Sequence, residues 1–274
     1  MDKSDNTVAE VGKEITKQSF SLFNKILKRT PHRMALDGYI SAVQQSEQLS
    51  PLEKAAYTWE AKKTIKKAVN ALKVCGMAIE EGLNTRRLEA VDTDWLDDYL
   101  EKASNVSHEE IQLLWAKILN QEVEEPNSMP RALLHSLSIM GRTEAENFMK
   151  VASYCVVIRN VNGDSDFLPI IYTDKLIHYY GLTLGSLSAL SAIGLLQFGT
   201  DLVEKIDDGD SIEFFGKTID AKDIKQKKDI PIGSVILSHT GEALMKIVAP
   251  EEPKGFFEEV IDPLFHGKEI KWNE

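Results

Sequence analysis

The clearest pattern of apolar and polar positions lies in residues 91–126, where apolar side chains recur at helical spacing in two separate runs. The second run places five apolar side chains on one face of a predicted helix: Ile111, Leu114, Trp115, Ile118 and Leu119. Ser107 and Glu110 stand three residues apart at the start of this run, which is the spacing of a capping box. Pro126 follows the run, where it cannot extend a helix.

The first run predicts a helix that opens at two acidic residues, Asp92 and Asp94, which the positive end of a helix dipole favours. Its apolar residues are Trp95, Leu96, Tyr99 and Leu100. Because the two predicted helices are close in sequence, we expect them to pack as a hairpin. Trp95 and Trp115 should then be buried between them.

The same residues carry a sequence signature that reads Val-Asp-x-Asp-Trp, then Val-Ser-x-Glu-Glu-x-Gln-x-x-Trp-Ala-x-Ile-Leu, then an acidic segment ending in Pro. The matching residues are Val91, Asp92, Asp94, Trp95, Val106, Ser107, Glu109, Glu110, Gln112, Trp115, Ala116, Ile118, Leu119 and Pro126. This stretch resembles an uncharacterised bacterial family of domains of unknown function, and its helix pattern is similar to the abortive-infection-alpha type of phage-defence protein. The resemblance implies a bacterial origin and a defence role, and it carries over no catalytic residue. Asn127 stands where such families carry Gly, which changes the turn.

Residues 8–29 predict an amphipathic helix with a basic polar side. Its irregular apolar stripe consists of Val8, Val11, Ile15, Leu22, Phe23, Ile26 and Leu27. The stripe favours packing on the protein's own core or on a second copy, and the alternative is contact with an anionic membrane surface. We expect a homo-oligomer, most simply a two-fold dimer, with this helix at or near the interface. A second short helix is predicted over residues 33–48.

A long helix is predicted over residues 52–81, after a second capping box formed by Ser50 and Glu53 and before a stop at Gly82. Four lysines form a basic patch on it: Lys62, Lys63, Lys66 and Lys67. The residues expected to be buried on the opposite side are Trp59, Ile65, Ala68, Val69 and Leu72. The patch is interpreted first as a solvated helix face. The alternatives are contact with nucleic acid, with an acidic partner, or with the acidic half of a neighbouring subunit.

Beyond residue 126 the pattern changes from helical to mixed. Helices are predicted over residues 128–140, 144–158, 171–180, 183–193 and 241–248, a loop over 160–166, a β-hairpin from 202–206 and 211–215, and a strand over 234–238. Thr143 and Glu146 have the spacing of a third capping box. Two motifs are similar to winged-helix domains, namely Leu-x-x-Leu-x-x-x-Gly-Leu-Leu from Leu187 and Leu-Ser-x-Thr-Gly-x-x-Leu from Leu237.

The predicted fold is mainly α, with a helical N-terminal region followed by a smaller winged-helix-like α+β region. Four parts are expected: a basic helical region 1–90, the signature helical domain 91–158, a winged-helix-like domain 167–250 and an aromatic-rich tail 251–274. The tail carries Phe256, Phe257, Phe265 and Trp272, and we expect it to dock on the protein or on a partner.

Charge is unevenly distributed along the 274 residues, whose net charge is −11. Residues 1–87 hold 15 Lys/Arg and 10 Asp/Glu, and the remainder holds 17 and 33. Such a step indicates two regions with different partners. Nonspecific nucleic-acid binding by the whole chain is disfavoured, because it depends on Lys and Arg neutralising phosphates. The polar N-terminus, the lack of an apolar run of about 20 residues and two apolar-flanked cysteines, Cys75 and Cys155, favour a cytoplasmic protein.

No constellation of residues in the sequence indicates catalysis, a cofactor or a metal site. Metalloprotease, Cys-x-x-Cys, Walker and nucleophile-elbow motifs are missing, and the six histidines do not pair at metal-ligand spacing. The densest acid cluster is Asp92, Asp94, Asp97, Asp98 and Glu101, and helix-start preference explains its first members. The acidic loop 162–166 lacks the downstream Glu of a calcium loop and is interpreted as a turn.

The sequence therefore predicts a non-enzymatic bacterial protein that acts through protein–protein contacts in phage defence. One alternative is a winged-helix regulator that binds nucleic acid. The expected recognition segment, residues 183–194, argues against it, because it has no Arg, Lys, Asn or Gln to contact bases or phosphates. The other alternative is a membrane-active defence effector that uses helix 8–29.

Overall fold

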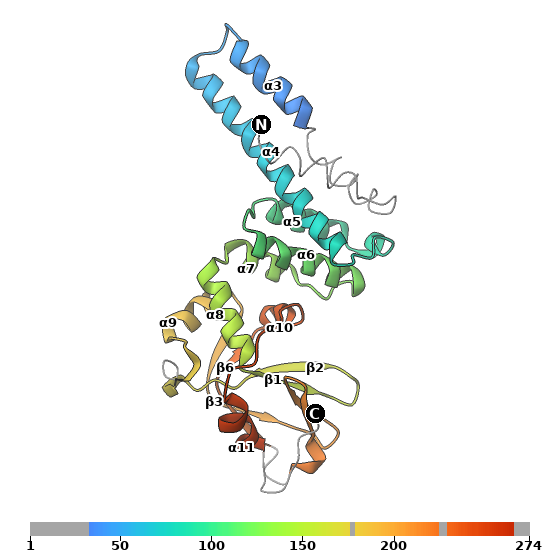
Figure 1. Ribbon diagram of the computed structural model, residues 1–274, viewed down its shortest axis with the longest axis vertical. Coiled ribbons are helices and arrows are strands. Elements are labelled where there is room, and N and C mark those ends of the chain that lie inside the picture. The colour runs from blue at the N-terminus through green and yellow to red at the C-terminus, as the bar shows by residue number, and fades with distance from the viewer. Residues whose placement is uncertain (1–32, 176–178, 225–228, 266–274) are drawn as a thin grey trace. The chain divides into compact units, whose positions relative to one another are not determined.

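The computed structural model describes residues 33–175, 179–224 and 229–265 (Figure 1). Helices dominate these residues, and strands form two small antiparallel sheets, so the fold is mainly α with a smaller β part. The chain divides into two compact units, Met1–Ser138 and Ile139–Glu274. The predicted helix 8–29, the C-terminal Trp272 and the segment 225–228 lie outside the described residues.

Unit 1 is helical. Its elements are α3 (Arg33–Gln45), α4 (Pro51–Glu80), the short 3-10 helix η1 (Leu88–Ala90), α5 (Thr93–Ala103), α6 (Glu109–Glu124) and α7 (Arg131–Ile139). The predicted capping box at the start of α4 is confirmed. The backbone N–H of Glu53 donates to the Ser50 hydroxyl at 3.3 Å, and the N–H of Ser50 donates to the Glu53 carboxylate at 2.8 Å. Gly82, at φ +97°, follows the end of α4 as predicted.

The core of unit 1 lies between α5 and α6, where Trp95 and Trp115 are both buried as predicted. Tyr99 lies with them: its ring stacks on Trp95 at 5.2 Å between centroids and contacts Trp115 at 5.4 Å. Two hydrogen bonds fix the large rings. Trp95 Nε1 donates to the Met129 carbonyl, and the Tyr99 hydroxyl donates to the Trp115 carbonyl, each at 2.7 Å. These bonds satisfy the Trp95 ring N–H and the Tyr99 hydroxyl, whereas the buried Trp115 Nε1 has no hydrogen-bond partner among the described residues.

The predicted capping box at the start of α6 is wrong. The helix begins at Glu109, its N-cap is His108, and no side chain bonds to the cap. The Ser107 hydroxyl instead accepts a hydrogen bond from Asn70 Nδ2 at 3.2 Å. Glu110 is exposed in the first turn. The Ser107 hydroxyl therefore bonds to the buried Asn70 amide on α4 and does not cap α6, because buried polar groups need hydrogen-bond partners.

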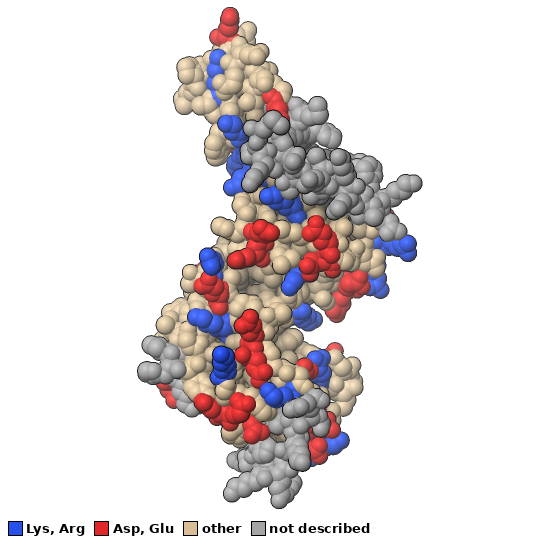
Figure 2. Space-filling view, viewed as in Figure 1, with Lys and Arg blue, Asp and Glu red and all other residues tan. Residues whose placement is uncertain are grey.

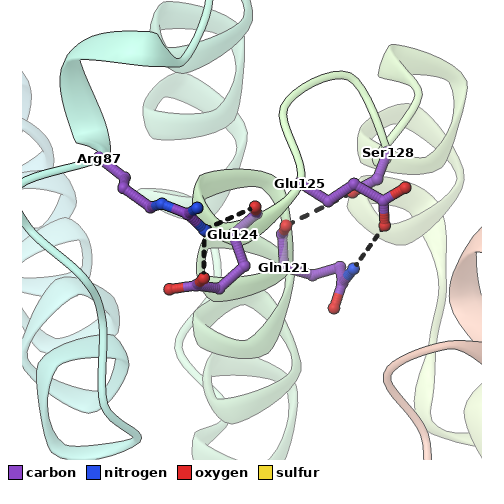
Figure 3. Close-up of polar contacts among 5 residues, drawn as sticks. All are labelled: Arg87, Gln121, Glu124, Glu125 and Ser128. Atoms are coloured by element: carbon purple, nitrogen blue, oxygen red, sulfur yellow. Dashed lines mark hydrogen bonds and ion pairs between the residues drawn. The ribbon is translucent and has the colours of Figure 1, made fainter.

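Polar contacts tie the end of α6 to the chain around it (Figure 3). Arg87, in the loop after α4, donates from Nη1 to the Glu124 carboxylate at 2.6 Å and to the Glu124 carbonyl at 3.1 Å. A cation at the C-terminus of a helix complements the helix dipole. Beside it, Gln121 donates to the Glu125 carboxylate at 3.2 Å, and the Ser128 hydroxyl donates to the Gln121 carbonyl at 3.4 Å.

Unit 2 combines helices with the two sheets. Its helices are α8 (Arg142–Ser153), α9 (Leu184–Ala192), α10 (His239–Met245) and α11 (Asp262–Phe265), with short 3-10 or π turns at Thr173–Lys175, Ala221–Asp223 and Phe257–Ile261. Its strands are β1 (Cys155–Arg159), β2 (Ser165–Pro169), β3 (Leu196–Lys205), β4 (Ser211–Phe214), β5 (Lys217–Asp220) and β6 (Asp229–Leu237). The four-stranded sheet has the order β2-β1-β4-β5, and β3 pairs with β6 in the other sheet.

The predicted helix 144–158 is too long, because the chain leaves α8 after Ser153 and enters strand β1. The strand sequence CVVIR is rich in β-branched residues, which fit a pleated surface better than a helix. The predicted capping box there is also wrong. Glu144, not Glu146, accepts from the Gly141 N–H at 3.0 Å, and Glu146 pairs with Arg142 at 2.9 Å. The predicted loop 160–166 is shorter, because its last two residues belong to β2.

The predicted hairpin of residues 202–206 and 211–215 is wrong. Strand β3 pairs with β6, and β4 pairs with β1 and β5. The two residues that join β4 to β5, Phe215 and Gly216, have φ values of +45° and +83°. Positive φ at both central residues makes the tight turn that suits a hairpin. The local turn therefore pairs β4 with the strand after it rather than the strand before it.

The predicted helices 183–193 and 241–248 are confirmed as α9 and α10, the latter beginning two residues earlier. Gly241 lies at a close approach of backbone, since a Cβ there would meet the Leu195 carbonyl oxygen at 2.2 Å. Phe256 and Phe265 from the predicted tail are buried in unit 2. The Phe256 ring contacts Tyr154 at 4.8 Å between centroids, so this part of the tail docks on its own unit.

A candidate interaction surface on helix α4

The four lysines of the predicted basic patch all lie on α4. Lys62, Lys63 and Lys66 are exposed, and Lys67 is half-buried. Lys63 Nζ lies 3.9 Å from the Glu60 carboxylate, one turn earlier on the same helix. An exposed pair of this kind contributes little to stability. The three exposed lysines therefore lie on a solvent-facing part of α4.

Trp59 is the residue that sequence reasoning misplaced. It was expected on the buried side of α4, and 64% of it is exposed. Residues three and four apart share a helix face, so Trp59 lies on the side of Lys62 and Lys63. The Lys63 ammonium lies 5.0 Å from the centroid of the Trp59 ring, which is cation–π geometry. The other residues expected to be buried, Ile65, Ala68, Val69 and Leu72, are half-buried.

Leu52 extends this side of α4 toward the start of the helix. It is 80% exposed and stands seven residues before Trp59, which in turn stands seven residues before Lys66. Seven residues are two helical turns, so these side chains follow one line along α4. We call Leu52, Trp59, Lys62, Lys63 and Lys66 the outer face of α4. The sevenfold spacing in the sequence is the signal that could have placed Trp59 on it.

Few apolar side chains pack against the first half of α4. No residue from Pro51 to Glu60 is buried, and the first buried position of the helix is Ala61. On α3, Val43 is the one buried residue among the side chains that are described there. Two hydrogen bonds join the helices: Gln44 Nε2 to the Thr58 hydroxyl at 2.6 Å, and Lys54 Nζ to the Gln44 carbonyl at 3.1 Å. Helices in proteins gain most of their stability from packing. Because few residues are buried here, this pair of helices keeps apolar surface that a further contact could bury.

The second half of α4 is anchored in unit 1. Its buried residues are Asn70, Ala71, Val74, Cys75 and Ala78. Asn70 Nδ2 donates to the Ser104 carbonyl at 3.0 Å, so an amide on α4 holds the end of α5. The outer face is thus presented by a helix whose far end is fixed by packing and hydrogen bonds.

The acid cluster on α5 is dispersed rather than convergent. The Asp92 carboxylate accepts from the Trp95 N–H at 2.8 Å and lies 3.4 Å from Arg131 Nη2, while Asp98 pairs with Lys102. Asp94, Asp97 and Glu101 lie on the exposed surface of the helix. Within residues 33–175, 179–224 and 229–265, no three His, Cys, Asp or Glu side chains converge as a metal site would need.

Lys and Arg follow α4 and acidic side chains gather over α5 on the side of unit 1 that Figure 2 shows. Residues 51–87 hold 8 Lys/Arg and 4 Asp/Glu, and residues 88–125 hold 2 and 11. Positive and negative surfaces are therefore separated by element within unit 1.

Neither cysteine is in a reactive state. Burial raises the pKa of the Cys75 thiol to about 12 and raises that of Cys155 further. Both thiols stay protonated at neutral pH, and a thiol is a much weaker nucleophile than a thiolate. Both behave as small core residues, in line with the interpretation of the sequence.

Glu122 is a buried carboxylate whose hydrogen-bond partners are backbone N–H groups. Its side chain is 1% exposed and accepts from the backbone N–H groups of Asn127 at 2.7 Å and Met129 at 2.9 Å. These bonds hold the turn from α6 to α7, where Asn127 has φ +70°. Burial raises the pKa of Glu122, and the backbone donors oppose this effect without cancelling it.

The segment that would read DNA in a winged helix is short of donors. Leu187 and Leu190 of α9 are buried, and Leu184 is exposed beside Thr183, whose hydroxyl caps the helix by accepting from the Ser186 N–H at 3.0 Å. Nearby β3 carries Glu204, whose pKa is raised by burial and by the charge of Asp166. Helix α9 has no Lys or Arg for the phosphate contacts that DNA binding needs, and β3 has one, Lys205.

Among the described helices, none has both the length and the apolar character that crossing a bilayer requires. A family model described as "Protein of unknown function (DUF2806)" matches residues 56–261. The matched range includes Trp59, the four lysines, α5 and α6, and most of unit 2. Comparison with curated proteins and with solved structures gives no match.

Proposed function

This chain belongs to the DUF2806 family, and we propose that it acts through contact with other protein molecules rather than through catalysis. The outer face of α4 is the proposed contact surface. The observation that carries the proposal is Trp59: an indole that is 64% exposed, with the Lys63 ammonium over its ring and further lysines on the same side. Tryptophan is enriched among the residues that dominate binding energy in protein interfaces.

The composition of the outer face suits a protein partner. Leu52 and Trp59 offer apolar area, and burying a tryptophan removes about 150–250 Å² from water. The lysines at the other end of the face attract acidic partners and speed their encounter without adding much affinity. We infer an amphipathic partner whose apolar surface covers Trp59 and whose acidic side chains face Lys62 and Lys66.

We propose phage defence as the biological setting, on the resemblance of residues 91–126 to abortive-infection-alpha proteins. The test is plating of phage on a bacterial host with and without the intact chain. A protective effect that is lost with Trp59→Ala would join the setting to the outer face. Equal plaque counts with and without the chain across a broad phage panel would contradict the proposed role in phage defence. They would not bear on the proposed contact surface.

We also propose that unit 2 contains a winged-helix-like arrangement that serves as a structural or protein-binding module. The support is the order of elements: α9 leads into β3, β3 pairs with β6, and β6 leads into α10 through the Ser238 cap. The acidic surroundings and the lack of donors on α9 favour this role over DNA recognition.

The test of the contact surface is photo-crosslinking in the producing cell. The photoreactive residue p-benzoylphenylalanine is placed at position 59, and in a matched control at position 161, where Val161 is 76% exposed in the turn after β1. We expect a protein adduct at position 59 that is missing at position 161 and that weakens when Lys62→Glu and Lys66→Glu are added. The proposal is wrong if position 59 gives no protein adduct, or if its adduct contains nucleic acid.

A further inference from the structure

We propose that residues 8–29 of the same chain cover the hairpin of α3 and α4 on the side that carries Tyr39 and Tyr57. This inference goes beyond the contact surface proposed above, because it concerns a different side of α4. Tyr39 and Tyr57 are each 45% exposed. We call the side of the hairpin that carries them the tyrosine side.

The hairpin has little core of its own. Among the side chains described on α3 and the residues 51–61 of α4, only Val43 and Ala61 are buried. Helices in proteins gain most of their stability by packing an apolar side against another element rather than from local propensity. One buried valine and one buried alanine give this pair of helices little such packing, so a further element has apolar surface to cover here.

The two exposed tyrosines lie at the edge of this small contact. Tyr39 stands four residues before Val43, and Tyr57 stands four residues before Ala61. Residues four apart share a side of a helix, so each tyrosine lies beside a buried residue of its own helix. An element that packs against the tyrosines therefore extends the existing core instead of starting a separate one.

Both tyrosines lie on the same side of the helix pair. Gln44, near the end of α3, donates to the Thr58 hydroxyl at 2.6 Å, and Lys54 donates to the Gln44 carbonyl at 3.1 Å, so the helices run antiparallel. Each tyrosine is displaced from its buried neighbour by about 40° in the same rotational sense. In an antiparallel pair, equal displacements in the same sense bring both side chains to one side of the pair. Tyr39 and Tyr57 thus border a single surface.

The length of the connection places residues 8–29 alongside α3. Only Thr30, Pro31 and His32 separate them from Arg33, where α3 begins. Two helices joined by about 2–5 residues form an antiparallel hairpin. The helix predicted for residues 8–29 would span about 33 Å, whereas the 13 residues of α3 span about 20 Å. The segment is therefore long enough to run along all of α3.

The same geometry brings an aromatic ring of the segment level with Tyr39. Counted in opposite directions from Pro31, Phe23 and Tyr39 each stand eight residues away, so they are neighbours in an antiparallel pair. Phe23 belongs to the apolar stripe of the segment. The other apolar residues in that part of the stripe are Leu22, Ile26 and Leu27. Packing them on the tyrosine side removes apolar surface of both partners from water.

Charge favours the tyrosine side over the outer face of α4 as the place for this segment. Residues 8–29 carry five Lys/Arg and two Glu. Glu53 and Glu60 stand four residues before and three residues after Tyr57, so carboxylates border the tyrosine side. Trp59 on the outer face is two residues from Tyr57, or about 200° around the helix, and lysines border it. A basic segment thus meets acids on one side and lysines on the other.

The test is photo-crosslinking within the purified full-length chain. The photoreactive residue p-benzoylphenylalanine replaces Tyr57 in one variant and Trp59 in the matched control. After irradiation, chains of unchanged mass are digested, and mass spectrometry identifies the joined peptides. We expect position 57 to join residues 8–29 at least about 10-fold more often than position 59, because the two positions lie about 200° apart on one helix. Equal yields, or no joined peptide from residues 8–29 at position 57, would overturn the inference.

A pair of cysteines tests the register of the contact. A short bismaleimide should join Phe23→Cys to Tyr39→Cys within one chain, and it should not join Phe23→Cys to Trp59→Cys. Cys75 and Cys155 are buried, so they compete little for the reagent. Circular dichroism checks that each variant is folded. Equal joining of the two pairs in folded chains would contradict the register.

Two further results would identify a different occupant. An adduct at position 57 with twice the mass of the chain, and none within one chain, would make the occupant a second copy and refute the inference. Binding of the full-length chain to vesicles of anionic phospholipid that Phe23→Asp abolishes, without an adduct inside the chain, would assign residues 8–29 to a membrane surface and also refute it. Neither result bears on the outer face, which the adduct of position 59 in the producing cell tests separately.

Discussion

The side-chain amide of Asn70 lies 3.0 Å from the carbonyl oxygen of Ser104, and it joins helix α4 to the end of α5 from inside the core. The same amide nitrogen donates to the Ser107 hydroxyl at 3.2 Å. One buried residue thus fixes the loop between α5 and α6 relative to the helix that carries the outer face. Because Asn70 joins α4 to this loop, it is the first residue at which to test how unit 1 is held together.

Asn70→Ala should lower the free energy of unfolding by about 1–3 kcal/mol, because it leaves the buried Ser104 carbonyl without its donor. Urea unfolding followed by circular dichroism measures the change. Lys73→Ala, at an exposed position one turn further along α4, is the matched control and should change stability by less than about 0.5 kcal/mol. Equal effects of the two substitutions would contradict the anchoring role of Asn70.

Trp115→Ala should lower stability, whereas Trp59→Ala should weaken association and leave stability nearly unchanged. Trp115 is fully buried, so its removal leaves a cavity and should cost about 3–5 kcal/mol of stability. Trp59 is largely exposed, so its removal should hardly change the stability of the monomer at low protein concentration but should weaken association with its protein partner. Denaturation of both variants tests the first effect, and crosslinking from position 62 in the producing cell tests the second. A large stability loss in Trp59→Ala as a monomer would place that indole in a core.

The stability of the wild type relative to Glu122→Gln should fall as the pH rises. Burial raises the pKa of Glu122 above its ordinary value of 4.5, so the folded state favours the protonated form. The stabilising contribution is complete below the unfolded-state pKa and is lost as the pH rises through the raised folded pKa. Urea unfolding of both proteins from about pH 4 to about pH 7 measures the difference. A difference that grows with pH would show that the backbone donors of Asn127 and Met129 outweigh burial.

Both thiols should be inert in the folded protein. Cys75 and Cys155 are buried, and burial raises the pKa of Cys75 to about 12. A thiol-specific reagent at neutral pH should therefore label the native chain slowly and the unfolded chain at once. The Asn70→Ala variant should label faster at Cys75, because that residue lies on the same helix one turn and a half further on. Rapid labelling of the native wild type at either cysteine would contradict the burial.

Duplex DNA should not bind at physiological salt. The segment 183–194 offers no cationic or amide donors, and phosphate contacts depend on such groups. A gel shift with the purified full-length chain tests this. Submicromolar binding that weakens steeply with salt would contradict the prediction, and its loss on reversing Lys62, Lys63, Lys66 and Lys67 would locate the site on α4.

Features that depend on neighbours in the chain could be predicted from the sequence. The Ser50 and Glu53 capping box, the stop at Gly82 and the Asp92 cap each involve residues within about four positions of one another, so their spacing is enough to predict them. The helical periods of α5 and α6 likewise place Trp95 and Trp115 on one inner side. The basic patch on α4 also follows from spacing alone.

Features that depend on distant residues could not be predicted in this way. Ser107 bonds to Asn70, 37 residues earlier, and this contact replaces the local cap that the spacing favours. Strand β4 pairs with β1, more than 50 residues earlier, and with β5 across a tight turn, so the hairpin expected with β3 does not form. A pattern of apolar positions shows that a strand exists, but its partner is chosen by the packing of the whole sheet.

The position of Trp59 depends both on helical spacing, which is local, and on packing by distant residues. The sequence by itself predicted that α4 is a helix with a basic patch of lysines, because helical spacing is a local property. The same spacing puts Trp59 on the side of Lys62 and Lys63, but the sequence was interpreted with Trp59 on the opposite, buried side. Only the tertiary structure decided that the side with Trp59 faces outward, because burial depends on which elements pack against each turn. Asn70 stands four residues after Lys66, so it continues the same side of α4, and packing in unit 1 buries this side at Asn70 but leaves Trp59, nearer the start of the helix, in solvent.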